Sequence, residues 1–140
     1  MQNILKTILC AAAIVAGSLT FVAPANASKL IKLMQSDLGD RRPKGCPNKW
    51  CACYMDQILA QAGFAEHGTN RARDFASYGK KAKATQVGSI MVMRSHIGVV
   101  MGKCDDGRVK IISGNYSKKV AVGCYSAKKA IAWRAPVKAR

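Results

Sequence analysis

The chain has 140 residues, with 23 Lys and Arg against 7 Asp and Glu, which gives a formal net charge of +16. This length suits one domain rather than two, and a composition of 49% apolar and 21% charged residues excludes wholesale disorder. The positive charge favours an anionic partner but says little about the fold.

The first 27 residues follow the three-part pattern of a secretory signal peptide. Lys6 precedes an apolar run over residues 8–21, and Ala25-Asn26-Ala27 forms a small-x-small site, so we expect cleavage after Ala27. An uncleaved membrane anchor is the alternative, but the run is shorter than the ~20 residues that a spanning helix needs. We therefore expect an exported protein, periplasmic or secreted, without stable membrane insertion after cleavage.

Export changes the choice of anionic partner. An exported chain rarely meets DNA or RNA, and its few aromatic residues are not interleaved with basic ones as in a nucleic-acid platform. Peptidoglycan or another anionic envelope polymer is the partner that the charge favours, through long-range attraction that salt would weaken.

The expected elements begin with two helices. Residues 28–45 are polar and are interpreted as an N-terminal arm and linker, which leaves 46–140 as the folded domain. Apolar residues recur at spacings of three and four from Trp50 to Ala62, which predicts an amphipathic helix with Asn48 as its N-cap and Gly63 as its stop. A shorter helix is predicted over residues 70–78.

The periodicity changes to that of strands after Gly88. Strands are predicted at 89–94, 97–102, 108–113, 120–125 and 130–134, with Asp106-Gly107 as a hairpin turn. Helices followed by strands predict an α+β fold, in which N-terminal helices pack on an antiparallel sheet of about five strands.

Five cysteines remain after cleavage: Cys46, Cys51, Cys53, Cys104 and Cys124. An odd number in an exported chain predicts two disulfides and one free thiol. We prefer pairs between Cys46 and Cys53 and between Cys104 and Cys124, although four cysteines allow three pairings and the sequence does not choose among them. A structural zinc site is disfavoured because no Cys-x-x-Cys pair is present and residues i and i+2 of a helix point apart.

Cys51 opens the first predicted helix, where free backbone N–H groups and the helix dipole favour a thiolate. His96 begins a strand and can meet that helix terminus, which gives the Cys–His pair of a nucleophilic enzyme. Asn115 ends the next strand at a comparable distance from the hairpin turn and can orient the imidazole. The alternatives are a packed core cysteine, a structural histidine and a simple turn at Gly114-Asn115. The other histidine, His67, is expected in a solvated loop.

Five short motifs then occur in one order: Trp50-Cys51-Ala52, Gly88-Ser89-Ile90-Met91-Val92, His96-Ile97-Gly98-Val99-Val100, Gly114-Asn115 and Trp133-Arg134-Ala135-Pro136. In this order the chain resembles the papain-like cysteine peptidases and amidases of bacterial cell walls, the CHAP and NlpC-type group. The resemblance implies a papain-like fold, with Cys51 as nucleophile, His96 as general base and Asn115 as orienting residue. It also implies cleavage of peptidoglycan amide bonds through a thioester, with no cofactor.

Three positions depart from the family's usual pattern. Ser89 stands where Asp is common, Tyr116 stands where Gln is common, and Cys53 lies two residues after the expected nucleophile. Two other functions stay open at this point. One is a catalytically inactive cationic module that binds the cell envelope, and the other is a toxin-like wall amidase used against competing cells.

Overall fold

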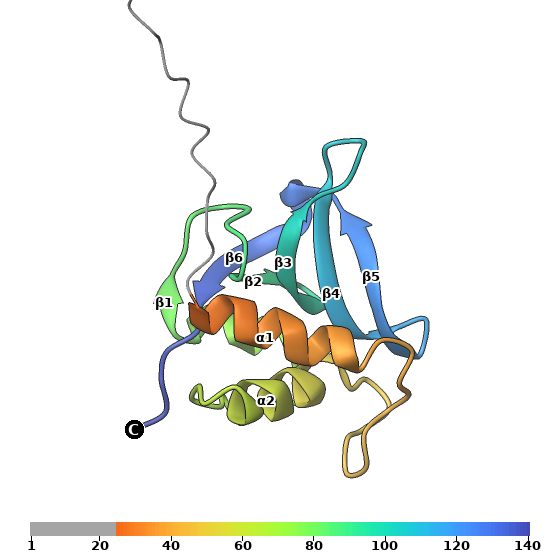
Figure 1. Cartoon of the computed structure of the whole chain (residues 1–140), viewed down its shortest axis with the longest axis vertical. Helices are drawn as coiled ribbons and strands as arrows, with labels where there is room; N and C mark the ends of the chain where they lie inside the picture. The colour runs from red at the N-terminus through yellow and green to blue at the C-terminus, as the bar shows by residue number, and fades with distance from the viewer. Residues whose placement is uncertain (1–24) are drawn as a thin grey trace, which may run out of the picture.

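The computed structural model describes residues 25–140, in which two α-helices lie on one side of a single antiparallel sheet (Figure 1). The helices are α1 (Ala25–Ser36), α2 (Cys51–Gln61) and the 3₁₀ helices η1 (Ala72–Ser77) and η2 (Ala127–Lys129). The strands are β1 (Lys80–Lys81), β2 (Ile90–Met93), β3 (Ile97–Lys103), β4 (Val109–Tyr116), β5 (Lys119–Tyr125) and β6 (Ala130–Ala135). The α+β prediction is confirmed.

The sheet has six strands in the order β1-β6-β2-β3-β4-β5, rather than the five predicted. The additional strand is β1, a two-residue edge strand that pairs with β6 and whose residues are both exposed. Two lysines carry no apolar alternation, so the pattern that reveals the other strands is missing here. The hairpin at Asp106-Gly107 joins β3 to β4 as predicted.

Both faces of the central strands are buried. All four residues of β2 are buried, and they divide between two apolar clusters: Ile90 and Val92 pack with the helices, whereas Met91 and Met93 pack on the opposite face with Trp133 of β6. Successive side chains of a strand point to opposite faces, so burial of both faces produces a continuous apolar run in the sequence.

Helix α2 covers residues 51–61, close to the predicted 50–62. It buries Met55, Ile58 and Leu59 against the sheet and ends at Gly63, whose φ of 84° suits glycine. The expected N-cap is wrong: Trp50 occupies the cap position without a side-chain capping bond, while the Asn48 side chain accepts a hydrogen bond from Arg42.

The expected N-terminal arm is also wrong in its first part, because residues 25–36 form helix α1. Leu30 and Met34, one turn apart, are both 0% exposed and belong to the main apolar cluster. Just after the helix, Asp37 accepts a hydrogen bond from the Tyr54 hydroxyl of α2 at 3.0 Å. Leu30, Ile31, Leu33 and Met34 recur at helical spacing, so the sequence held a signal for this helix that the polar residues after it obscured.

Most of the predicted signal peptide lies outside the described residues. Only its last three residues, Ala25-Asn26-Ala27, are described, as the first residues of α1. Cleavage after Ala27 would leave Leu30 and Met34 in the mature chain. In residues 25–140 no helix is both long and apolar enough to cross a membrane.

The second predicted helix is the shorter 3₁₀ helix η1, and the loop before it is not freely solvated. His67 is half-buried, with Nε2 2.9 Å from the Asp74 carbonyl and its ring 5.1 Å from Phe75. Its neighbours are held by Asp56, a buried carboxylate of α2 that accepts hydrogen bonds from the backbone N–H groups of residues 67–69. These contacts correct the expectation for His67, and they fix the segment that leads into η1.

Disulfides join Cys46 to Cys53 and Cys104 to Cys124, the two pairs preferred from the sequence. Their Cα atoms are 5.7 and 6.2 Å apart, which is ordinary disulfide spacing. The first ties the loop before α2 to the first turn of that helix, and the second ties the end of β3 to β5. Among the described residues, Cys51 is the cysteine left outside a disulfide.

Candidate active site

Cys51 is the first residue of α2 and is 5% exposed. Because the first N–H groups of a helix have no partner within it, they are available to a group at its N-terminus. The thiol lies within hydrogen-bond reach of its own N–H and those of Ala52 and Ile97, and each lowers its pKa.

Burial nevertheless raises the pKa of the Cys51 thiol above its usual value and outweighs these three backbone contacts. The helix N-terminus favours a thiolate, as expected, but its effect on the pKa is smaller than that of burial. The resting side chain is a neutral thiol surrounded by groups that stabilise negative charge on sulfur. Such a thiol needs a base to take its proton during attack.

His96 lies between β2 and β3, one residue before the Ile97 amide that faces the Cys51 thiol. Its ring is half-buried and stacks on Tyr125 of β5, with ring centroids 5.6 Å apart and planes at 25°. Burial lowers the pKa of His96 to about 4. The imidazole is therefore neutral near pH 7, the form that can accept a proton.

The residue that holds the imidazole is Ser113, which the sequence reasoning missed. His96 Nε2 lies 2.9 Å from the Ser113 hydroxyl oxygen, and Ser113 is 0% exposed. A signal was present, since a hydroxyl within the apolar Ile111-Ile112-Ser113 run needs a partner when it is buried.

Asn115 does not bond His96, because its backbone turns the side chain elsewhere. Its φ is 58°, and the register of β4 and β5 shifts between Ser113 and Tyr116. The Asn115 amide donates instead to the Asn48 carbonyl at 3.4 Å. Strands β3 and β4 are adjacent, as the hairpin turn predicts. The register shift between Ser113 and Tyr116 cannot be seen from residue spacing, so the predicted partner of His96 was wrong.

Tyr125 is a second residue that the sequence reasoning missed. Besides stacking on His96, it has a hydroxyl whose pKa is raised to about 12 by burial, with smaller contributions from Tyr116 and Cys51. Tyr125 therefore lies near both Cys51 and His96. The strand pattern of β5 contains no sign that one of its residues reaches this site.

Two glycines allow the close packing of the site. A Cβ atom on Gly98 would lie 2.8 Å from the Ile112 carbonyl oxygen and 3.0 Å from Ser113 Cβ, so glycine lets β3 and β4 approach beside the His96–Ser113 pair. A Cβ atom on Gly114 would lie 2.6 Å from the Tyr54 ring and 2.7 Å from the Trp50 ring. Gly114 thus sets how closely the start of α2 sits on β4.

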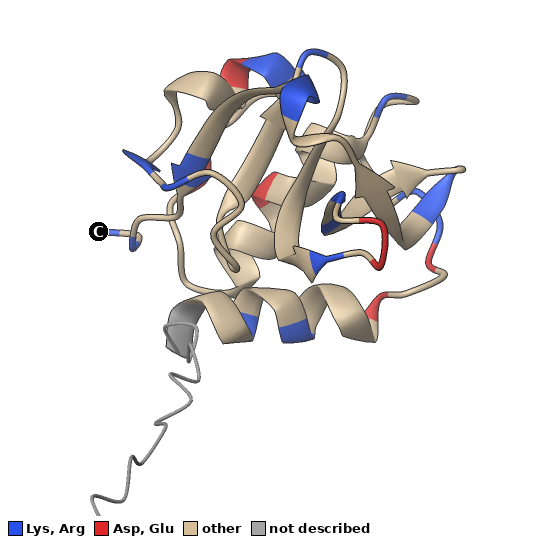
Figure 2. Cartoon of the chain, turned by 90° about the horizontal axis from the view of Figure 1, so that it is seen from above, with Lys and Arg blue, Asp and Glu red and all other residues tan. Residues whose placement is uncertain are grey.

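Cys51 is one of the residues that line a cleft of about 270 Å³, here called the Cys51 cleft. Four basic residues line it, namely Lys49, Arg71, Arg73 and Arg94, and no acidic residue does. Residues 48 to 51 divide it from a second cleft of about 500 Å³, because Lys49 and Cys51 face the first cleft while Asn48 and Trp50 face the second. Arg41, Arg42 and Lys118 also line the second cleft. Figure 2 shows that Lys and Arg outnumber Asp and Glu along the rest of the described chain as well.

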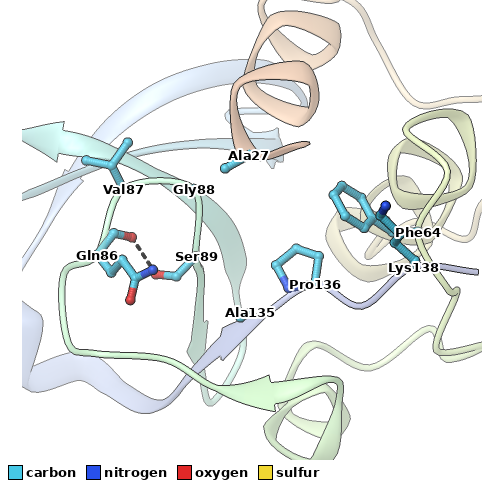
Figure 3. Close-up of a pocket in the computed structure, with 9 residues that line it drawn as sticks. All are labelled: Ala27, Phe64, Gln86, Val87, Gly88, Ser89, Ala135, Pro136 and Lys138. Atoms are coloured by element: carbon cyan, nitrogen blue, oxygen red, sulfur yellow. Dashed lines mark hydrogen bonds between the residues drawn. The ribbon is translucent and has the colours of Figure 1, made fainter. Parts of the chain in front are cut away.

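A third cavity, of about 170 Å³, lies where the start of α1, the loop before β2 and the chain after β6 meet (Figure 3). Phe64, Val87 and Pro136 line it, while Lys138 is its one charged residue. Cys51, the cysteine outside a disulfide, does not line this cavity but does line the Cys51 cleft, so a thiol nucleophile points to the latter. Within residues 25–140, no group of three or more His, Cys, Asp or Glu side chains is arranged to hold a metal ion.

One comparison with known proteins identifies a family. No curated protein matches the chain. The family model of the CHAP domain matches residues 43–115, which are 73 of the 140 residues and include α2, η1 and β1 to most of β4. Cys51, His96, Ser113 and Asn115 all lie within the match, whereas α1, β6 and Tyr125 lie outside it. The chain belongs to the CHAP domain family, whose members are typically amidase or peptidase hydrolases.

Proposed function

We propose that the protein is an exported cysteine hydrolase that cleaves amide bonds of peptidoglycan, as an amidase or an endopeptidase. One observation supports this best. Cys51, the free cysteine of the described chain, begins α2, and its thiol is near the backbone N–H of Ile97. The residue before Ile97 is His96, whose Nε2 is hydrogen-bonded to Ser113. Membership of the CHAP family supports a hydrolase of the peptidoglycan type.

The proposed reaction begins with attack of the Cys51 sulfur on the carbonyl carbon of the scissile amide. His96 accepts the thiol proton at Nδ1, which is free when the Nε2 proton is donated to Ser113. Carbon–sulfur bond formation moves the carbonyl electrons onto oxygen, and the Cys51 N–H at the start of α2 is a candidate donor to that oxyanion. Collapse breaks the carbon–nitrogen bond, and the imidazolium gives its proton to the departing amine.

The thioester that remains is released by water. His96 takes a proton from water as the hydroxide oxygen bonds to the acyl carbon, and collapse then breaks the carbon–sulfur bond. The acid product leaves, and the proton returns to the Cys51 sulfur. In this scheme Asn115 makes no hydrogen bond to the imidazole, and its side chain donates to the Asn48 carbonyl in the loop before α2.

Export is the second part of the proposal, with the signal peptide removed after Ala27. Two disulfides and a cell-wall hydrolase domain are compatible with an extracytoplasmic protein. N-terminal sequencing of the exported protein tests this part, with Ser28 as the expected first residue.

Digestion of isolated peptidoglycan tests the enzymatic part. The wild type and a Cys51→Ala variant are incubated with the wall, and released fragments are identified by mass spectrometry. Fragments from the wild type alone support a cysteine hydrolase, and their masses identify the bond. If neither protein releases fragments while both sediment with the wall, the function is that of a binding module instead.

A further inference from the structure

The Cys51 cleft carries more positive charge than its own residues can neutralise. Arg71 is paired with Asp74 at 3.0 Å. Within the described chain, Lys49, Arg73 and Arg94 have no ion pair, although all three line the same cleft. Three unpaired cations at one concave site produce a local positive potential that attracts an anion.

The segment that carries Arg71 and Arg73 is held in place by hydrogen bonds within the protein. Asp56 holds residues 67–69 through three backbone N–H groups, with distances of 2.7, 2.8 and 3.1 Å. Asp74 binds both the Thr69 hydroxyl and the Arg71 guanidinium. The backbone of Arg71 and Arg73 is therefore positioned, so binding an anion there costs less ordering entropy than in a free loop.

Arginine also narrows the chemistry of the anion. Its planar guanidinium donates parallel hydrogen bonds that match two oxygens of a carboxylate or a phosphate, and of these two anions a wall peptide carries the carboxylate. Cys51, Arg73 and Arg94 line the same cleft of about 270 Å³, so a substrate attacked by Cys51 there also meets the arginines. A carboxylate close to the scissile amide is therefore the anion that we expect this cleft to bind.

We infer that the Cys51 cleft binds a carboxylate of the substrate through Arg73 and Arg94, so that the enzyme selects peptides with a free carboxylate beside the scissile bond. This inference rests on the proposed function and adds the substrate class to it. Peptides whose carboxylates are converted to carboxamides keep their size but lose the charge, and they should be poor substrates.

The test compares isolated peptidoglycan before and after chemical amidation of its carboxyl groups. For the wild type we expect the rate of fragment release to fall about tenfold or more on amidation, as expected for loss of a charge-assisted hydrogen bond. The double variant Arg73→Gln/Arg94→Gln should be slow on untreated wall and show little further loss on amidated wall. The control Lys128→Gln/Lys129→Gln, which removes the same charge from exposed residues outside both clefts, should keep the full amidation effect.

The outcomes separate this inference from the proposed function. Equal wild-type rates on the two walls would overturn the inference and leave the hydrolase standing. The same would follow if amidation slowed the Arg73→Gln/Arg94→Gln variant as strongly as it slows the wild type. No fragments from either wall would overturn the proposed function and this inference with it.

Discussion

The imidazole Nε2 of His96 lies 2.9 Å from the hydroxyl of Ser113, two residues before the asparagine that the sequence pointed to. Ser113 is fully buried on β4, so this hydroxyl has a fixed position. A neutral hydroxyl can orient the ring but does not stabilise its positive charge as a carboxylate would. The site therefore combines a neutral thiol with a neutral imidazole.

Ser113→Ala should reduce hydrolysis more than Asn115→Ala does. Loss of the hydroxyl frees the ring of His96, and we expect kcat to fall roughly tenfold or more with KM little changed, because ring orientation affects the chemical step. Asn115→Ala removes a 3.4 Å bond to the Asn48 carbonyl and should cause a smaller loss. Steady-state rates of fragment release measure both, and a larger loss for Asn115→Ala would restore asparagine as the orienting residue.

The pH dependence of hydrolysis should reflect the low pKa of His96, about 4. The base must be unprotonated, so activity should rise as pH increases through about 4 and be fully developed by pH 6. An unperturbed histidine would place this rise near 6.5. Ser113→Asp places a carboxylate beside the ring, stabilises the imidazolium and should move the acid limb to higher pH. The peptidoglycan substrate titrates in the same way in both assays, so any difference between the profiles comes from the enzyme. Identical acid limbs for the wild type and Ser113→Asp would contradict this account.

Gly114→Ala should weaken both the fold and the activity. The added methyl group meets the rings of Trp50 and Tyr54, which are themselves buried, so the start of α2 must move away from β4. Overpacking of this kind costs about 1–3 kcal/mol of the free energy of unfolding. Urea denaturation measures that loss, and the activity of the folded variant shows whether Cys51 has moved. A variant with wild-type stability and activity would mean that α2 does not depend on this contact.

The two disulfides should contribute differently to activity. In the chain-entropy model, a loop of 20 residues such as Cys104–Cys124 contributes about 3 kcal/mol, and one of seven such as Cys46–Cys53 contributes about 2 kcal/mol. The short loop fixes the first turn of α2, so Cys46→Ser/Cys53→Ser should lose more activity than Cys104→Ser/Cys124→Ser despite the smaller stability loss. Unfolding curves and rates of wall digestion for the two double variants decide this, and the reverse order of activity would contradict it.

The α+β class, the bounds of α2 and five of the six strands could be predicted from the sequence. Long apolar patterns and the turn at Asp106-Gly107 are local signals, and tertiary packing did not override the elements that they predict. Helix α1 was missed although Leu30, Ile31, Leu33 and Met34 recur at helical spacing, because the polar and charged residues after it led to the whole segment being interpreted as an arm and linker.

The residues of the candidate site could also be predicted only in part. Cys51 and His96 could be singled out because a cysteine at a helix start and a histidine before a strand are chemically distinctive. Ser113 replaced Asn115 as the partner of His96 because a bulge and a φ of 58° at Asn115 redirect that side chain, and register irregularities are not visible in residue spacing. The raised pKa of Cys51 could not be predicted because burial, a property of the whole fold, outweighs the helix terminus.

Alkylation of Cys51 tests the central claim most directly, since the other four cysteines of the described chain are in disulfides. The protein is treated with iodoacetamide without reductant, and samples taken over time are assayed for wall digestion and for carboxamidomethylation of the Cys51 peptide by mass spectrometry. If Cys51 is the nucleophile, activity falls in proportion to modification and reaches zero when every Cys51 is alkylated. Full activity in completely alkylated protein would contradict the account.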